Sequence, residues 1–189
     1  MISQAEAAGA LRDIEASEAR ALEARGYAHA SPQLILWGIA WIVGYTLTGL
    51  VPVHSWGWVW LSVDLAGLVG SAILARCVPP AGSSSAALAS RFFWPSFLVM
   101  LAAGAFLGAV FYIFGPASTD AYLIFPALLL GLIYVVIGAW RMHRTAWIGA
   151  AIFLLSFLGF LFLKPFLSFW IAAVGGGGLV LGGLWLRKA

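Results

Sequence analysis

Charged residues are scarce in this sequence. Asp, Glu, Lys and Arg make up 9% of the 189 residues, whereas hydrophobic residues make up 63%. A soluble domain carries roughly a quarter charged residues, because its surface faces water. The shortage of charge therefore excludes a water-soluble globular domain. It predicts an integral membrane protein, in agreement with a mean hydropathy of +1.00.

Cysteine and histidine are equally rare. Cys77 is the single cysteine, which excludes a disulfide within the chain. All three histidines lie at or outside the ends of the hydrophobic runs, which excludes a haem held by two histidines within the bilayer. The sequence has no HExxH motif, no Cys-His zinc spacing and no Ser-His-Asp set. We therefore expect no metal, no cofactor and no enzymatic activity.

Six hydrophobic segments follow a polar N-terminal stretch, and each is near the roughly 20 residues that a helix needs to cross a bilayer. Their outer turns are short, so we expect hairpins over about 34–76, 92–140 and 146–186. The predicted fold class is an all-α membrane protein, with six transmembrane helices arranged as three hairpins in a domain spanning 31–189.

Residues 1–30 are predicted to form a separate cytoplasmic helix and linker. Ser3 with Glu6 is a capping box, Gly26 is a plausible stop, and Ser31-Pro32 suits the start of the first span. No apolar core of a signal peptide is expected here. The apolar stripe is broken, so residues 3–26 are expected to contact water, a cytoplasmic partner or a second copy of the chain.

Basic residues lie almost entirely on one side of the predicted spans, nine against Lys164 alone. The nine are Arg12, Arg20, Arg25, Arg76, Arg91, Arg141, Arg144, Arg187 and Lys188. This asymmetry predicts that both termini are cytoplasmic, in the inner (plasma) membrane of a bacterium. It accounts for the net charge of +3 without a nucleic-acid partner. Trp56 and Trp58 fall near the outer interface, as expected of an aromatic belt.

The three hairpins look like copies of one unit. Each outer turn has a proline: Pro52, Pro116 and Pro165. Matching glycines flank the first two, Gly44 with Gly108 and Gly67 with Gly131; in the third copy Gly175 to Gly178 come slightly earlier. The stretches "LLLGLIYVVIGAW" (128–140) and "GGGGLVLGGLWL" (175–186) carry the pattern. The arrangement resembles the small bacterial membrane proteins of the HdeD type, which implies three successive hairpins and no set of catalytic residues. The acidic N-terminal helix departs from that family.

Asp64 is the only acidic residue inside a predicted span, and an ionised Asp at mid-bilayer costs about 2.5–3.5 kcal/mol. We expect a polar intramembrane site in which the Tyr45 hydroxyl reaches Asp64, with Thr48 and Ser62 nearby. This site either binds a proton or a cation, or joins helices by a hydrogen bond.

Two further patterns favour contacts between helices. Trp37 and Trp41 continue to Tyr45 at four-residue spacing, which predicts an aromatic wall for a flat ligand or a cation, or simple anchoring and packing. Gly104 with Gly108, and Gly178 with Gly182, form GxxxG pairs that let helices approach closely.

Three classes of function remain open. The first is a small transporter or channel-like protein with its polar centre at Asp64 and Tyr45. The second is a non-catalytic membrane sensor or partner-binding protein that acts through the N-terminal helix. The third is the substrate-binding membrane subunit of a vitamin importer, which has a similar length and number of spans.

Overall fold

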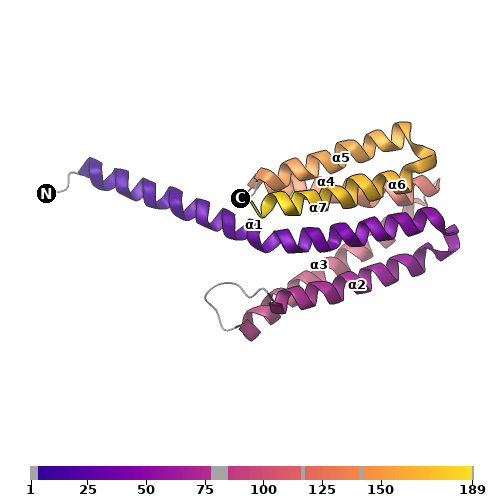
Figure 1. Ribbon diagram of the computed structural model, residues 1–189, viewed down its shortest axis with the longest axis horizontal. Helices are drawn as coiled ribbons and strands as arrows, with labels where there is room; N and C mark the ends of the chain where they lie inside the picture. The colour runs from indigo at the N-terminus through magenta and orange to yellow at the C-terminus, as the bar shows by residue number, and fades with distance from the viewer. Residues whose placement is uncertain (1–3, 78–84, 116–117, 141–142, 189) are drawn as a thin grey trace.

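The computed structural model describes residues 4–77, 85–115, 118–140 and 143–188, and these residues form helices without any strand (Figure 1). Five helical stretches in this described part of the chain are long and apolar enough to cross a membrane. They are Gly26–Leu50, Val53–Leu74, Thr119–Ala139, His143–Phe162 and Lys164–Leu186. These helices are compatible with a multi-pass membrane protein and confirm the all-α class.

The chain alternates long helices with short turns. The long helices are α1 (Gln4–Leu50), α2 (Trp56–Cys77), α3 (Ser85–Phe114), α4 (Thr119–Trp140) and α5 (His143–Phe162). Short helical turns, η1 (Val53–Ser55) and η2 (Lys164–Phe166), lead into α2 and into the last rod. That rod consists of α6 (Leu167–Ile171), the π-helical η3 (Ala172–Gly176) and α7 (Gly177–Leu186). We call the end of the bundle with η1 and η2 the turn end, and the end with Tyr27 and Arg187 the terminal end (Figure 1).

Helix α1 is continuous from Gln4 to Leu50, so the expected stop at Gly26 and restart at Ser31-Pro32 are wrong. Proline removes one backbone hydrogen bond and tends to kink a helix, and α1 changes direction where it enters the bundle (Figure 1). Contacts with distant residues hold the helix together at this point. The Ser31 hydroxyl donates to the carbonyl oxygen of Gly183 at 2.7 Å rather than capping its own helix, and Tyr27 is buried.

The bundle is organised around α1. Helix α1 packs on α7, on η3 and on α2, while α4 packs along α5. In Figure 1 α2 and α3 lie on one side of α1, and α4 to α7 lie on the other. Helix α3 packs mainly on α2, and most of its described side chains are exposed. The apolar stretch described in α3, Leu101–Phe114, is shorter than a membrane span, so the sixth span and the three-hairpin arrangement stay predictions.

A close approach between helices lies where α1 meets the π-helical turn. A Cβ atom added to Gly38 would lie 2.7 Å from the carbonyl oxygen of Gly176, and one added to Gly176 would lie 2.7 Å from the backbone nitrogen of Ile42. No side chain fits between backbones this close. Glycine at both positions is therefore a requirement of the packing of α1 on the last rod.

The GxxxG pairs have different surroundings. Gly178 and Gly182 lie against Ile152 and Ile148 of α5. A Cβ added to Gly104 or Gly108 meets nothing within 4 Å among the described atoms. No described residue packs against Gly104 or Gly108, so the expected close packing there stays a prediction.

The matching glycines of the expected repeat also differ in their contacts. Gly44 faces the Trp60 ring, while its counterpart Gly108 has no described atom within 4 Å of an added Cβ. Gly67 faces Trp37, while Gly131 meets the backbone of α5. Corresponding positions thus have unlike contacts, and the repeat remains a pattern of the sequence.

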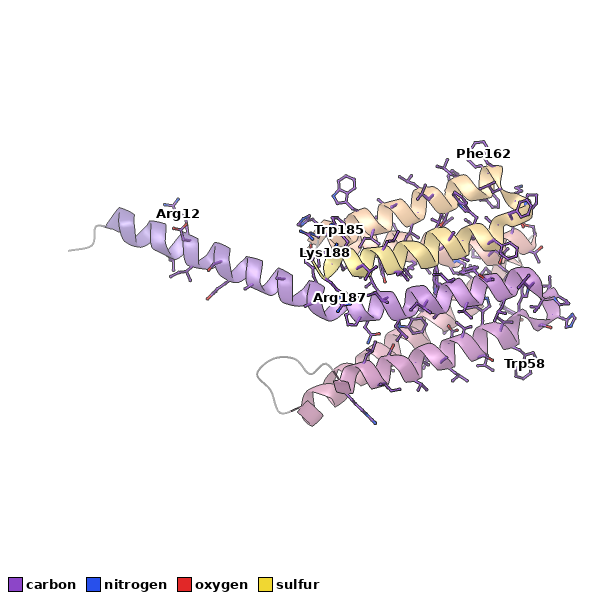
Figure 2. All side chains as sticks on the ribbon, viewed as in Figure 1. Arg12, Trp58, Phe162, Trp185, Arg187 and Lys188 are labelled. Carbon is purple, nitrogen blue, oxygen red and sulfur yellow. The ribbon has the colours of Figure 1, made fainter. Side chains whose placement is uncertain are left out.

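Two buried clusters form the core. One lies toward the turn end, around Tyr45, Leu123, Ala127, Leu167 and Ile171. The other lies toward the terminal end, around Tyr27, Leu34, Ile152, Leu179 and Leu186. Large apolar side chains cover the outside of the bundle as well; Trp58 and Phe162, for example, are 73% and 76% exposed and point away from it (Figure 2). An apolar exterior of this extent suits contact with lipid rather than with water.

Candidate functional site

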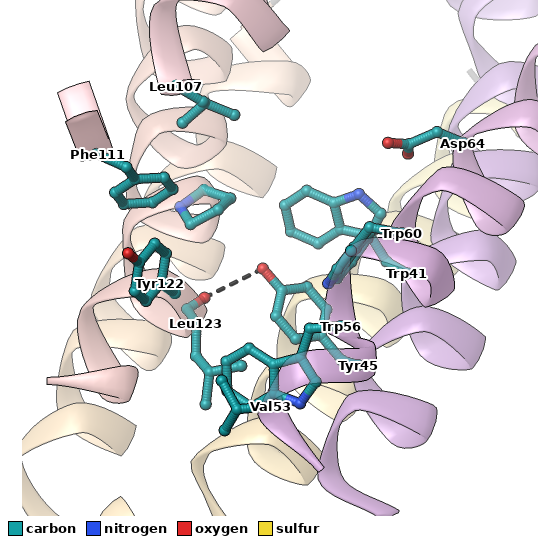
Figure 3. Close-up of a pocket in the computed structure, with 12 residues that line it drawn as sticks. Trp41, Tyr45, Val53, Trp56, Trp60, Asp64, Leu107, Phe111, Tyr122 and Leu123 are labelled. Carbon is teal, nitrogen blue, oxygen red and sulfur yellow. Dashed lines mark hydrogen bonds between the residues drawn. The ribbon is translucent and has the colours of Figure 1, made fainter. Parts of the chain in front are cut away.

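A cavity of about 520 Å³ lies between helices α1, α2, α3 and α4, in the half of the bundle nearer the turn end. The described residues of its walls include six aromatic side chains and a single charged one (Figure 3). The lining residues are Trp41, Tyr45, Val53, Trp56, Gly57, Trp60, Asp64, Leu107, Phe111, Tyr122, Leu123 and Pro126. The cavity is therefore mostly apolar, with one carboxylate.

Asp64 supplies that carboxylate. It lies on α2 eight residues after Trp56, which places it about 12 Å along the helix from the turn end. Its carboxylate points across the cavity toward the side formed by α3 and α4 (Figure 3). No described residue donates a hydrogen bond to this carboxylate or forms an ion pair with it. The group is thus available to a ligand that enters the cavity.

Tyr45 shares the cavity with Asp64, but its hydroxyl does not bind the carboxylate. The hydroxyl donates to the backbone carbonyl oxygen of Leu123 on α4, at 3.1 Å (Figure 3). The Tyr45 ring also packs edge-to-face on Trp41 and Trp60, with centroids 5.4 and 4.8 Å apart. The expected pairing with Asp64 is wrong, because a backbone acceptor on α4 takes the hydroxyl.

The other two residues of the expected polar site lie outside the cavity. The Thr48 hydroxyl donates to the carbonyl oxygen of Gly44 at 2.7 Å, and the Ser62 hydroxyl donates to that of Trp58 at 2.8 Å. Both are hydrogen bonds back to the preceding turn of the same helix, the usual arrangement for Ser and Thr within a helix. Neither hydroxyl is left to serve Asp64.

The expected aromatic wall divides into two parts. Trp41 lines the cavity, with its ring against Gly175 of the π-helical turn. Trp37 instead lies between α1 and α2, where its Nε1 donates to the Ser71 hydroxyl at 3.2 Å. Ser71 in turn donates to Gln33 Oε1 at 2.9 Å. Trp37 therefore joins two helices, and only Trp41 belongs to the site.

Trp56 and Trp60 take the place of Trp37 in the cavity wall. With Asp64 they recur every fourth residue on α2, and this spacing puts all three on one face of a helix. The signal was present in the sequence, but Trp56 was assigned to the interfacial belt together with Trp58. Position on the helix separates the two: Trp58 points away from the bundle (Figure 2), and Trp56 points inward.

The opposite wall comes from the meeting of α3 and α4. Phe111 packs against Tyr122 with a centroid separation of 4.6 Å, and against Phe125 at 5.8 Å. Pro126 lies inside α4 and has no N–H, so the carbonyl of Tyr122 lacks its usual helical donor. Gly115, with φ +47°, ends α3 and lets the chain turn toward α4.

The chemical groups around the cavity favour a positively charged ligand. A carboxylate accepts hydrogen bonds, and aromatic faces attract cations through their quadrupole. No cationic side chain is among the described residues that line the cavity. Among residues 4–77, 85–115, 118–140 and 143–188, no three His, Cys, Asp or Glu side chains gather into a metal site.

Comparison of the chain with known protein families, with curated proteins and with solved structures finds no match. The resemblance to the HdeD type therefore stays a prediction. Any assignment of function to the cavity depends on its own residues and geometry.

Proposed function

We propose that this chain is a small multi-pass transporter or channel-like protein that carries a cation through the cavity at Asp64. The observation that supports the proposal most strongly is the Asp64 carboxylate, which faces a 520 Å³ cavity within an apolar bundle without a described partner. A carboxylate used only to join membrane helices would be expected to have a donor on a neighbouring helix.

Energetics favour an exchangeable cation at this position. An ionised Asp near the middle of a bilayer costs about 2.5–3.5 kcal/mol even on the lenient insertion scales. A proton removes that cost by neutralising the group, and a bound cation lowers it by pairing with the charge. Proton and cation would therefore compete for the same carboxylate, which is the basis of exchange.

The distribution of basic residues supports an orientation for this transport. The sequence pattern assigns nine basic residues to the side of the termini and Lys164 alone to the other, so we propose cytoplasmic termini in the inner membrane. The cavity then belongs to the outer half of the membrane. A cation would enter it past Val53 and Trp56 at the turn end.

The test is proton movement into liposomes that contain the purified protein, followed with an internal pH-sensitive dye under an imposed membrane potential. We expect flux in the wild type and its loss in Asp64→Asn and Asp64→Leu, with all three proteins retaining their melting temperatures within a few degrees. Asp120→Asn is the matched control, since Asp120 lies in the first turn of α4 and outside the cavity. Flux equal to that of empty liposomes, or flux retained in Asp64→Asn, would contradict the proposal.

The N-terminal half of α1 favours a second candidate, a sensor or partner-binding protein. This segment projects away from the bundle (Figure 1), and its side chains Leu11 and Ile14 are 57% and 54% exposed. A cytoplasmic protein that co-purifies with the full chain but not with a chain lacking residues 3–26 would support this candidate.

A further inference from the structure

The cavity at Asp64 is poorly suited to a small metal cation. Ca²⁺ takes six to eight oxygen ligands in proteins, and even Mg²⁺ needs octahedral oxygen coordination. The described cavity wall offers one carboxylate, and the remaining side chains are almost all aromatic or aliphatic. A bare ion would lose its hydration shell here without replacement ligands.

The same walls suit a cation that carries its charge on an organic group. Trp56 and Trp60 of α2 stand on the face of the helix that also carries Asp64, and Trp41 of α1 adjoins them. Phe111 and Tyr122 face them from α3 and α4 (Figure 3). Rings thus lie on both sides of the space that the carboxylate enters. Aromatic rings around a cationic group are the usual means by which proteins bind quaternary ammonium ions.

The volume of the cavity points the same way. Sites for small organic molecules enclose about 300–1,000 Å³ and are mainly apolar with few polar groups. A cavity of about 520 Å³ falls within that range and far exceeds the space of a proton or a sodium ion. We infer that its ligand is an organic ammonium ion bearing aromatic or alkyl groups, held by Asp64 and by the faces of Trp41, Trp56 and Trp60.

This inference rests on the proposed function in one respect, the use of Asp64 as a cation-binding group, and it specifies the chemical class of the cation. A neutral apolar molecule would fit the walls but would gain nothing from the ionised form of Asp64. An anion would be repelled by it. Charge complementarity therefore selects the cation.

The test is equilibrium binding of benzyltrimethylammonium to the purified full-length protein, measured by calorimetry. The uncharged comparator is benzyl tert-butyl ether, which has a similar shape. We expect saturable binding of the ammonium ion and binding of the ether that is at least about tenfold weaker, because the ether lacks the charge that rings and carboxylate attract. Equal affinity for the two compounds would overturn the inference.

Substitutions in the cavity wall test whether the ammonium ion binds there. We expect Asp64→Asn to weaken ammonium binding at least about tenfold, and Trp60→Leu to weaken it by a similar factor, with Trp60→Phe in between because Phe keeps a ring with a weaker quadrupole. The matched control is Trp58→Leu, which removes an indole that is 73% exposed and lies two residues from Trp60. Unchanged affinity in Asp64→Asn would contradict the assignment of binding to this cavity. An equal loss of affinity in Trp58→Leu and Trp60→Leu would contradict it as well. Melting temperatures verify that each variant is folded.

This binding measurement and the flux measurement fail independently. Ammonium binding that depends on Asp64, without any proton flux, would support the ligand class and contradict proton transport. Proton flux that depends on Asp64, without ammonium binding, would support transport and contradict the ligand class.

Discussion

The Tyr45 hydroxyl donates a hydrogen bond to the backbone carbonyl oxygen of Leu123, and this bond joins α1 to α4 across 78 residues of sequence. It lies at the edge of the cavity and fixes the distance between two of its walls. Tyr45 thereby acts on the site through its position, since its hydroxyl already donates to Leu123.

Removal of that hydroxyl in Tyr45→Phe keeps the ring contacts with Trp41 and Trp60 and leaves the Leu123 carbonyl without its second donor. Hydrogen bonds between membrane helices average about 0.6 kcal/mol, with a maximum near 1.7. We expect a loss of stability in this range, measured by unfolding in detergent, and little change in ammonium affinity. A large loss of affinity at unchanged stability would show that the hydroxyl touches the ligand.

Gly38 is expected to tolerate no side chain. The methyl group of Gly38→Ala would lie within 3 Å of backbone atoms of Gly176 and Val180, which cannot rotate away. We expect a fall in melting temperature of several degrees, or failure to fold, as overpacking typically costs about 1–3 kcal/mol. Gly104→Ala is the matched control, because the added methyl group meets no described atom and alanine favours helix by about 1 kcal/mol. Equal destabilisation of both variants would contradict the close approach at Gly38.

Two buried serines should respond in opposite ways to alanine. Ser168 donates to the carbonyl oxygen of Tyr45, whereas Ser156 is 0% exposed and its hydroxyl has no hydrogen-bond partner among the described residues. Burial of an unpaired hydroxyl costs about 1–3 kcal/mol. We expect Ser156→Ala to raise the melting temperature and Ser168→Ala to lower it. A lower melting temperature for Ser156→Ala would reveal a partner for that hydroxyl.

Deletion of residues 1–24 should leave the bundle intact, since Leu11 and Ile14 are exposed and the described packing of α1 on the core begins at Tyr27. Tyr27 itself belongs to the bundle: it lies 5.8 Å from the Arg144 guanidinium, and its hydroxyl accepts a hydrogen bond from the Arg144 backbone N–H. We expect Tyr27→Ala to destabilise the protein by about 3–5 kcal/mol, as for other buried aromatic side chains. A shorter chain that unfolds at a clearly lower temperature would place the N-terminal segment in the core.

The orientation can be tested with single cysteines after Cys77→Ser. We expect an impermeant thiol reagent to label Ser118→Cys in intact cells, because this exposed position lies between α3 and α4 at the turn end. Lys188→Cys at the terminal end should be labelled only after the membrane is broken. The reverse pattern would overturn the orientation drawn from the basic residues.

The sequence predicted the bounds of individual helices well and the contacts between helices poorly. The expected segments 56–76 and 121–140 match α2 and α4 within two residues, because apolar runs and polar turns are local signals. The continuity of α1 was missed, because it depends on Ser31 and Gly183, which meet only in the folded chain.

The candidate site was also predicted only as far as local sequence signals allow. Asp64 was found by its charge, and the spacing of Trp56, Trp60 and Asp64 would have added the cavity wall. The opposing rings of Phe111 and Tyr122 depend on how α3 meets α4, which helical periodicity does not specify.

The depth of Asp64 has an electrical consequence. The carboxylate lies about 12 Å from the turn end in a bilayer whose core is about 30 Å thick, so a cation that reaches it has crossed roughly 40% of the membrane voltage. A full crossing is equivalent to about 2.3 kcal/mol per 100 mV, and this partial crossing to about 0.9 kcal/mol. With cytoplasmic termini and a negative interior, voltage alone would tighten binding from outside about fivefold per 100 mV. Occupancy of the cavity would then report the energised state of the cell.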